Sequence, residues 1–276
     1  MTTLNKVTPV LATVLGILAA ALALFPFYWM LRTAVAPAEG LTTTGLSLIP
    51  VEFDFSNLGR AWDKANLGQA MLNGIAVTLG ILVLQLLTCI PAAYALSKFR
   101  FQGEGFILGL VLACLLIPHQ ATMIPTFVGL NLLGLGDTRL GLVLPFVTSA
   151  IGIFMLRQQM MAVPDAIMEA AKTDGLGPLR TLVSVVVPIS APSIAAFSML
   201  SVFTHWNDYL WPLLVARSPD IMTPPLSLAI FQNADTGFDY PALAAAAAIV
   251  TAPVIILFLL AQRHFVRGMA GTEVAG

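Results

Sequence analysis

The side chains that could do covalent chemistry are few and widely separated in this chain of 276 residues. The three histidines, His119, His205 and His264, do not form the His-Glu-x-x-His pattern of a metal site. No Gly-Lys pair occurs, which excludes a phosphate-binding P-loop, and the two "GLG" segments lack the third glycine of a dinucleotide fingerprint. No nucleophile is paired with a base. We therefore expect no catalytic site, no metal and no cofactor bound by this chain.

A second group of polar side chains interrupts apolar runs, where polar groups are costly and usually face a cavity. His119 and Gln120 directly follow Pro118, where a distorted helix would also free backbone carbonyls. Such side chains could line a path through a membrane, and the alternative for each is a hydrogen bond to a neighbouring helix. For Trp206 the alternative is anchoring at the membrane interface. The candidates for the path are Asn73, Gln85, His119, Gln120, Thr122, Ser190, Ser198, Trp206, Asn207 and Asp208.

The elements that carry these residues are predicted to be membrane-spanning helices. The chain is 58% hydrophobic and 10% charged, with a mean hydropathy of +0.89, whereas soluble domains carry about 25% charged residues. A spanning helix needs about 20 mostly apolar residues, and six runs meet this requirement. The first run continues through Trp29, which argues against a cleaved secretory signal. We expect an all-α integral membrane protein, a single transmembrane domain over 1–276, with spans near 10–31, 75–96, 106–128, 140–156, 182–203 and 242–262.

The distribution of basic residues predicts the orientation in the membrane. With the N-terminus inside, the cytoplasmic segments hold eight of the 13 Lys and Arg residues, and they lie close to helix ends. Both termini are therefore expected to be cytoplasmic. The long outside loop, 32–74, contains apolar residues at helical spacing from Phe55 to Ala65, which indicates either a surface helix or a solvated spacer. The eight inside residues are Lys6, Lys98, Arg100, Arg157, Lys172, Arg180, Arg263 and Arg267.

One inside segment, "MEAAKTDGLGPLRTLVSVVVPISAP" (168–192), is a polar island in an apolar chain. Pro164 and Asp165 favour a helix start just before it, and Gly175 favours a left-handed C-terminal cap. A helix this short is not stable alone, so it either docks into a groove on a partner or belongs to an ordinary loop. Pro188 and Pro192 predict a bend in the next helix. One helical face is mostly small and apolar and consists of Ile167, Ala170, Ala171 and Asp174.

The island resembles the "EAA" loop of bacterial ABC importer permeases in the spacing of Glu169-Ala170-Ala171, Gly175 and Pro188. "LIPHQATMIPTF", "WNDYLWPLL" and "QRHFVRGM" resemble the carbohydrate-uptake branch, in particular the second permease subunit of maltose-type and glycerol-3-phosphate-type importers. The resemblance implies a type I ABC importer permease fold of six transmembrane helices, with a cytoplasmic coupling helix in the loop 164–180. It implies ATPase coupling through Glu169, Ala170, Ala171, Asp174, Gly175 and Pro188.

By the same resemblance the chain would lie in the bacterial inner membrane, in a heterodimer with a second permease chain. Two ATPase subunits would bind ATP and Mg, and an extracytoplasmic binding protein would deliver the solute. The "QRHFVRGM" segment favours sn-glycerol-3-phosphate or glycerophosphodiesters such as glycerophosphocholine, with disaccharides or oligosaccharides as the alternative. An ATP-independent secondary transporter is the alternative of another class, but no Asp, Glu, Lys or Arg lies at mid-span to relay ions. A net charge of −1 and the lack of a basic stripe exclude nucleic acid.

Overall fold

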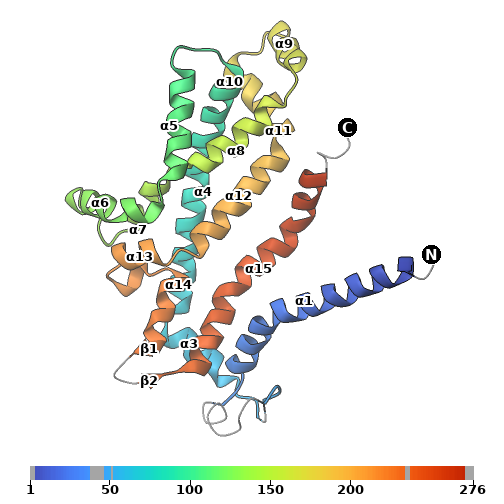
Figure 1. Cartoon of the computed structure of the whole chain (residues 1–276). Helices are drawn as coiled ribbons and strands as arrows, with labels where there is room; N and C mark the ends of the chain where they lie inside the picture. The colour runs from blue at the N-terminus through green and yellow to red at the C-terminus, as the bar shows by residue number, and fades with distance from the viewer. Residues whose placement is uncertain (1–3, 38–46, 51, 234–236, 271–276) are drawn as a thin grey trace. The chain divides into compact units, whose positions relative to one another are not determined.

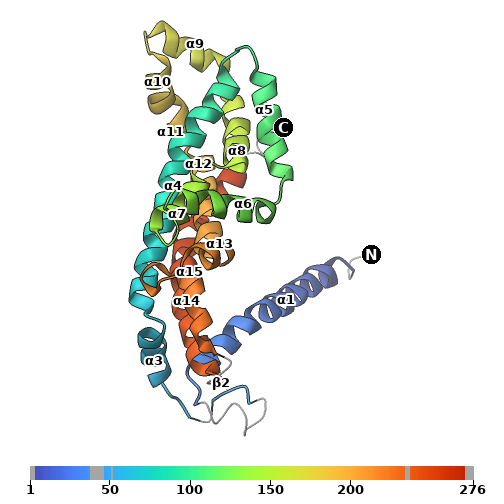
Figure 2. The same ribbon diagram turned by 90° about the vertical axis from the view of Figure 1, so that its left-hand side faces the viewer.

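The computed structural model describes residues 4–37, 47–50, 52–233 and 237–270. Within these ranges the structure does not describe the side chains of residues 4–10, 232–233, 237 and 261–270. The side chains of Lys6, Arg263, Arg267 and the "QRHFVRGM" motif are among these. The described chain is largely helical (Figures 1 and 2). It divides into two compact units. One unit comprises Met1–Gly68 with Ser227–Ala252, and the other comprises Gln69–Leu226 with Pro253–Gly276.

The first unit contains a long helix α1 whose side chains are exposed from Leu11 to Tyr28. For the loop 32–74 the sequence indicates either a surface helix or a solvated spacer, and the structure has a helix there, α3. Asn57 of α3 is fully buried, and its Nδ2 donates to the carbonyl oxygens of Ala34 and Ala36, each at 3.0 Å. The elements are α1 (Leu4–Ala34), α3 (Ser56–Lys64), η4 (Leu228–Phe231), β1 (Gln232–Asn233), β2 (Gly237–Phe238) and the first part of α15 (Tyr240–Ala270).

Three helices of the described chain are long and apolar enough to cross a membrane: α1, α4 and α15. Three further helix pairs meet the same test if each bent pair counts as one span, which gives six. The members of these pairs meet at 100°, 44° and 80°.

The second unit consists of α4 (Leu67–Lys98), α5 (Glu104–Leu116), α6 (His119–Leu132), α7 (Arg139–Val143), η1 (Leu144–Phe146), α8 (Ala150–Met161), α9 (Asp165–Thr173), α10 (Pro178–Thr181), η2 (Leu182–Val186), α11 (Val187–Ile189), α12 (Ala191–Trp206), α13 (Leu210–Val215), η3 (Pro219–Ile221) and α14 (Pro224–Ser227), with the end of α15.

The break between α5 and α6 lies inside the predicted run 106–128, and proline explains it. Ile117 and Pro118 both adopt extended backbone conformations, with ψ of 113° and 132°. A residue that precedes proline is disfavoured in the helical region because the ring clashes with its backbone. The chain therefore leaves α5 before Pro118 and starts α6 at His119, turning by 100°.

The bend predicted from Pro188 and Pro192 is confirmed. The chain from Pro178 to Ile189 meets α12 at 80°, and the turn occurs at Ser190. Just before it, Leu182–Val186 form a π-helical turn. Because proline has no N–H, Pro192 cannot close the hydrogen bond to the residue four positions earlier, which lets the helix break here.

Two apolar clusters hold the second unit together around α4. One joins α4 to α8, η2 and α12 through residues such as Cys89, Leu156 and Phe197. In it Gly152 lies so close to Phe197 that a Cβ on the glycine would be 2.5 Å from the ring. The other cluster joins α4 to α6, α7 and α13, with Trp211 at its centre. Both clusters include residues of α4, which therefore packs against elements from α6 to α13.

Candidate functional site

Helix α9 is the polar island, and its two ends are built as the sequence predicts. It begins at Asp165, one residue after Pro164, and ends at Thr173. Gly175 has a φ of +77°, in the left-handed region, so the predicted cap is confirmed. Its N–H donates to the carbonyl of Lys172 at 3.1 Å, while the N–H of Leu176 reaches Ala171 at 3.0 Å. This pair of bonds is the Schellman motif, which ends a helix sharply and satisfies its last carbonyls.

Most of α9 is exposed on the second unit. Ala171 is buried and Met168 is half-buried, whereas the predicted coupling residues Glu169, Ala170 and Asp174 are exposed. The apolar Ile167 is also exposed. The predicted docking face is therefore split, because Ala171 packs inward while its other members face outward. In the described chain Glu169 and Lys172 form no ion pair, although their spacing permits one.

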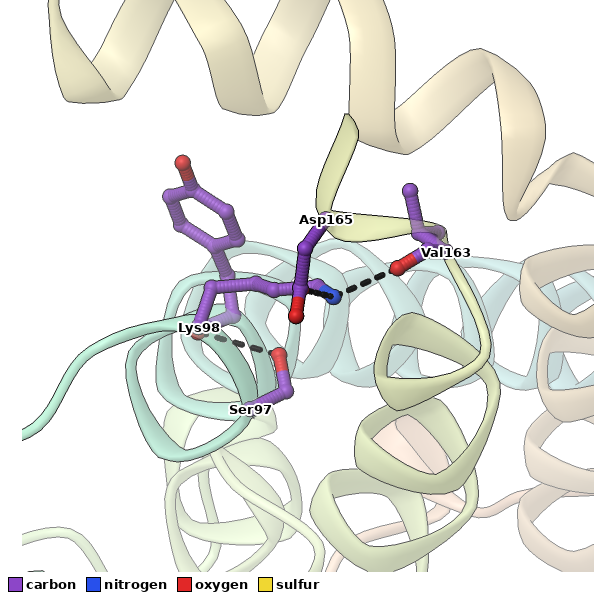
Figure 3. Close-up of polar contacts among 5 residues, drawn as sticks. Ser97, Lys98, Val163 and Asp165 are labelled. Carbon is purple, nitrogen blue, oxygen red and sulfur yellow. Dashed lines mark hydrogen bonds and ion pairs between the residues drawn. The ribbon is translucent and has the colours of Figure 1, made fainter. Parts of the chain in front are cut away.

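The start of α9 is attached to the end of α4. Nζ of Lys98 donates to the carbonyl oxygen of Val163 at 2.6 Å and lies 3.3 Å from Oδ1 of Asp165 (Figure 3). The neighbouring Ser97 hydroxyl donates to the carbonyl of Tyr94 within α4. Figures 1 and 2 show α9 at the end of the unit where α4 finishes, with α13 away from that end.

A second group of polar and aromatic side chains includes Gln85, in the middle of α4. We use the name histidine cluster for Gln85, His119, Phe146, Ser201 and His205. Nε2 of Gln85 is 3.3 Å from Nε2 of His205, and the Ser201 hydroxyl donates to Oε1 of Gln85 at 2.7 Å. Both histidine rings contact the ring of Phe146, with centroid distances of 5.1 and 4.7 Å. The cluster offers hydrogen-bonding groups and aromatic faces from four elements.

Asp208 and Trp211 adjoin the histidine cluster beyond the end of α12. The ring of Trp211 packs edge-on against Phe146, and its Nε1 donates to the carbonyl of Gly141 at 3.2 Å. Oδ1 of Asp208 accepts a hydrogen bond from the backbone N–H of Trp211 at 3.3 Å. Burial raises the pKa of the Asp208 carboxyl, and the hydrogen bond from Trp211 opposes this effect. Trp211, which is almost fully buried, therefore fixes the position of the chain just after α12.

Asn73 lies apart from the histidine cluster, 12 residues earlier on α4, or about 18 Å at 1.5 Å per residue. Its Nδ2 donates to the carbonyls of Asp220 and Met222 at 2.8 and 2.9 Å, and its Oδ1 accepts from Nε of Arg139 at 3.0 Å. The side chain is fully buried. These bonds give Asn73 the structural role of holding the segment that follows α13.

The other candidates for the path are dispersed. Ser198 donates to the carbonyl of Ile194 in its own helix. Ser190 is fully buried at the break before α12, and its hydroxyl has no hydrogen-bond partner among the described residues. Trp206 is buried. The exposed ones are Gln120, Thr122 and Asn207, of which Thr122 and Asn207 bond to carbonyls of their own helices.

Comparison with known proteins identifies the family of this chain. Residues 85–271 match the family described as binding-protein-dependent transport system inner membrane component. The arabinooligosaccharides transport system permease protein AraQ of Halalkalibacterium halodurans is 32% identical over 99% of both chains. The chain belongs to this family. The sn-glycerol-3-phosphate transport system permease protein UgpE of Pectobacterium atrosepticum is 30% identical to the permease over 94% of both chains.

A solved structure shows the same fold. A bacterial ABC transporter involved in the import of the acidic polysaccharide alginate contains a chain that superposes on the permease with a TM-score of 0.85. The two chains are 26% identical, and the match covers 96% of the permease and 99% of that chain. The family resemblance and the fold expected from the sequence are thereby confirmed. The protein is a membrane permease of the ABC carbohydrate importers, with the type I importer permease fold.

Sequence reasoning missed three members of the histidine cluster and the role of Lys98. In the sequence His205 is only one of three separated histidines, and Ser201 and Phe146 carry no local signal. His205 and Ser201 lie 120 and 116 positions from their partner Gln85, so no local pattern could join them. Lys98 appears in the sequence only as a basic residue that indicates orientation.

Proposed function

We propose that the permease forms one half of the membrane path of an ATP-driven importer of oligosaccharides. Its partners would be a second permease chain, two ATPase subunits that bind ATP and Mg, and an external solute-binding protein. The family description names dependence on a binding protein, which supports the last of these. Both termini and α9 would lie in the cytoplasm of a bacterium, and this chain would bind no cofactor.

The exposure of α9 carries the proposal. A nine-residue helix is too short to be stable alone in water, yet α9 is capped at Gly175 and attached to α4 while most of its surface is left open. An exposed Ile167 beside the small Ala170 suits a groove on a partner, because small residues permit close approach. The ATPase would occupy this face, so that its closure displaces α9 and the helices behind it.

The chemistry of the histidine cluster supports an oligosaccharide as the solute. Amide, imidazole and hydroxyl groups can donate to and accept from sugar hydroxyls, and the rings of Phe146 and Trp211 provide apolar faces against which a sugar could pack. The relative at 32% identity is an arabinooligosaccharide permease, and the solved structure belongs to a polysaccharide importer. The cluster would therefore contact the solute during its passage.

A glycerol phosphate is the second candidate, favoured by the similarity to the sn-glycerol-3-phosphate permease UgpE. A phosphate is usually held by Arg or Lys, and the histidine cluster contains neither. We therefore rank it below an oligosaccharide, although the resemblance of the C-terminal segment points toward it.

Uptake by cells with and without this chain tests the proposal. Labelled arabinooligosaccharide, lactose, sn-glycerol-3-phosphate and glycerophosphocholine would be supplied separately. We expect loss of oligosaccharide or disaccharide uptake when the chain is absent, and unchanged uptake of both phosphorylated compounds. Selective loss of the phosphorylated compounds would reverse the order of the two candidates, and no change with any of the four would contradict the proposed solutes.

A further inference from the structure

Lys98 is the last residue of α4, and its side chain is only 7% exposed. Its ammonium group lies between the carbonyl of Val163 and the carboxylate of Asp165, which flank Pro164 at the start of α9 (Figure 3). Burying a lysine is costly unless its charge is paired and hydrogen-bonded. Here the buried group satisfies a backbone carbonyl and holds a first-turn acid, so one side chain joins α4 to the start of α9.

Few other contacts determine the direction of α9. Ala171 is buried and Met168 packs against the apolar cluster around Leu156, but the rest of the helix is exposed. One side of α9 borders a cavity of about 700 Å³ whose lining includes Lys98, Glu169 and Thr181. Because this space is open, apolar packing alone does not fix α9 there, and the bonds of Lys98 become the main polar restraint at its start.

The helix that carries Lys98 also carries Gln85 of the histidine cluster. The two residues are 13 positions apart on α4, which is continuous between them although Pro91 cannot donate its backbone hydrogen bond, and this spacing corresponds to about 20 Å. Arg157 of α8 adds a second attachment at the same end, since its Nε donates to the carbonyl of Leu96 at 2.9 Å. The end of α4 is thus bonded to both α8 and α9, while its middle is bonded to α12 through Gln85.

From this geometry we propose that Lys98 is a positioning residue that makes α9 and α4 move as one body. A displacement of α9 by a docked ATPase would then reach the histidine cluster along α4. This inference rests on the proposed function, because it requires α9 to be the surface that the ATPase engages.

The test is the amount of solute imported per ATP hydrolysed by the complete importer in proteoliposomes. Lys98→Met removes the ammonium and keeps an apolar stem of similar length. Arg100→Met is the matched control, since Arg100 is a nearby cation whose side chain is 95% exposed and pairs only locally with Glu104. We expect Lys98→Met to lower the import-to-hydrolysis ratio roughly two- to thirtyfold, the usual range for a residue that transmits coupling, and Arg100→Met to leave it unchanged.

Asp165→Asn gives a second variant with little risk to folding, because the Asp165 side chain is 90% exposed. We expect a smaller decrease in the ratio, and no further decrease when Asp165→Asn is added to Lys98→Met, since both act through one contact. If Lys98→Met does not assemble, the ratio of Asp165→Asn decides. If the assembled variants import as much solute per ATP as the unsubstituted importer, the role of Lys98 is overturned but the proposed function is not. If the unsubstituted complex shows no ATP-dependent import, the proposed function itself is overturned.

Discussion

Gln85 of α4 is hydrogen-bonded to His205 of α12, with 3.3 Å between their Nε2 atoms. The Ser201 hydroxyl donates to Oε1 of Gln85, so the amide nitrogen of Gln85 is the donor to His205. This orientation assigns the accepting Nε2 of His205 as unprotonated, an assignment that follows from the hydrogen-bond network. One amide therefore links two helices and selects the tautomer of a histidine in the histidine cluster.

Gln85→Leu should lower both stability and uptake. The substitution leaves the Ser201 hydroxyl and His205 without their partner, and each buried polar group left unpaired costs about 1–3 kcal/mol. Thermal unfolding in detergent and solute uptake would be compared with Ser198→Ala. Ser198 is the control because its hydroxyl bonds only within its own helix, to Ile194. An unfolding midpoint for Gln85→Leu equal to that of Ser198→Ala would show that the link contributes nothing.

Gly152→Ala should destabilise the contact between α8 and α12. The new methyl would lie 2.5 Å from the ring of Phe197, which is itself buried in the apolar core. Overpacking of this kind costs about 1–3 kcal/mol, and we expect a lower unfolding midpoint in detergent. Gly109→Ala on α5 is the matched control, since nothing lies within 4 Å of its Cβ. There alanine should stabilise the helix by up to about 1 kcal/mol, so equal midpoints for the two variants would count against the packing described.

Gly175→Leu should uncouple ATP hydrolysis from import. Space is available for the side chain, but a left-handed conformation costs a residue with a Cβ about 1–2 kcal/mol, so the end of α9 would shift. Gly175→Asn should restore coupling because asparagine tolerates this conformation. Gly177→Ala controls for added bulk, since Gly177 has an ordinary φ of −70°. Equal import per ATP in all three variants would mean that the cap has no part in coupling.

Glu169→Lys tests the exposed face of α9 without changing its caps. The side chain is exposed, so the fold should be retained while the charge presented to the ATPase is reversed. We expect assembly to be complete or partial and solute import per ATP to fall. Import at the unsubstituted level, measured in proteoliposomes with equal amounts of bound ATPase, would remove Glu169 from the coupling surface.

Acidification should loosen the loop around Asp137, which lies between α6 and α7. Oδ1 of Asp137 accepts from the backbone N–H groups of Arg217 and Ser218 at 2.7 and 2.9 Å. The backbone hydrogen bonds from Ser218 and Arg217 lower the pKa of this carboxyl below its usual 3.8. The carboxylate therefore stabilises the loop fully above about pH 3.8, and this contribution is lost as the pH falls through the lowered pKa.

Hydrogen exchange of the Arg217 and Ser218 amides measures this effect. After correction for intrinsic exchange, their protection should stay constant down to about pH 4 and fall at lower pH. In Asp137→Asn the protection should be lower at neutral pH and should not change in that acid range. Protection that is identical in the two proteins at neutral pH would contradict the role of the carboxylate.

The sequence predicts local features of this fold well and distant contacts poorly. Gly175 and the proline pair at 188 and 192 set the backbone directly, so the cap and the bend could be predicted from residue type. The 100° turn at Pro118 could not, because a proline indicates distortion without giving its angle. The bond of Gln85 to His205 and that of Lys98 to Val163 join residues 120 and 65 positions apart, and only the folded packing of α4 brings them together.

The contact between α9 and the ATPase is the central claim, and site-specific photo-cross-linking tests it most directly. A photoreactive amino acid would replace Ala170, which is exposed on α9, in the complete importer in membranes. The same amino acid at Ile151, exposed on α8, is the control. We predict an ATP-sensitive cross-link to the ATPase from position 170 and none from position 151. A fully assembled, transport-competent importer with no ATPase cross-link from position 170 would contradict the account.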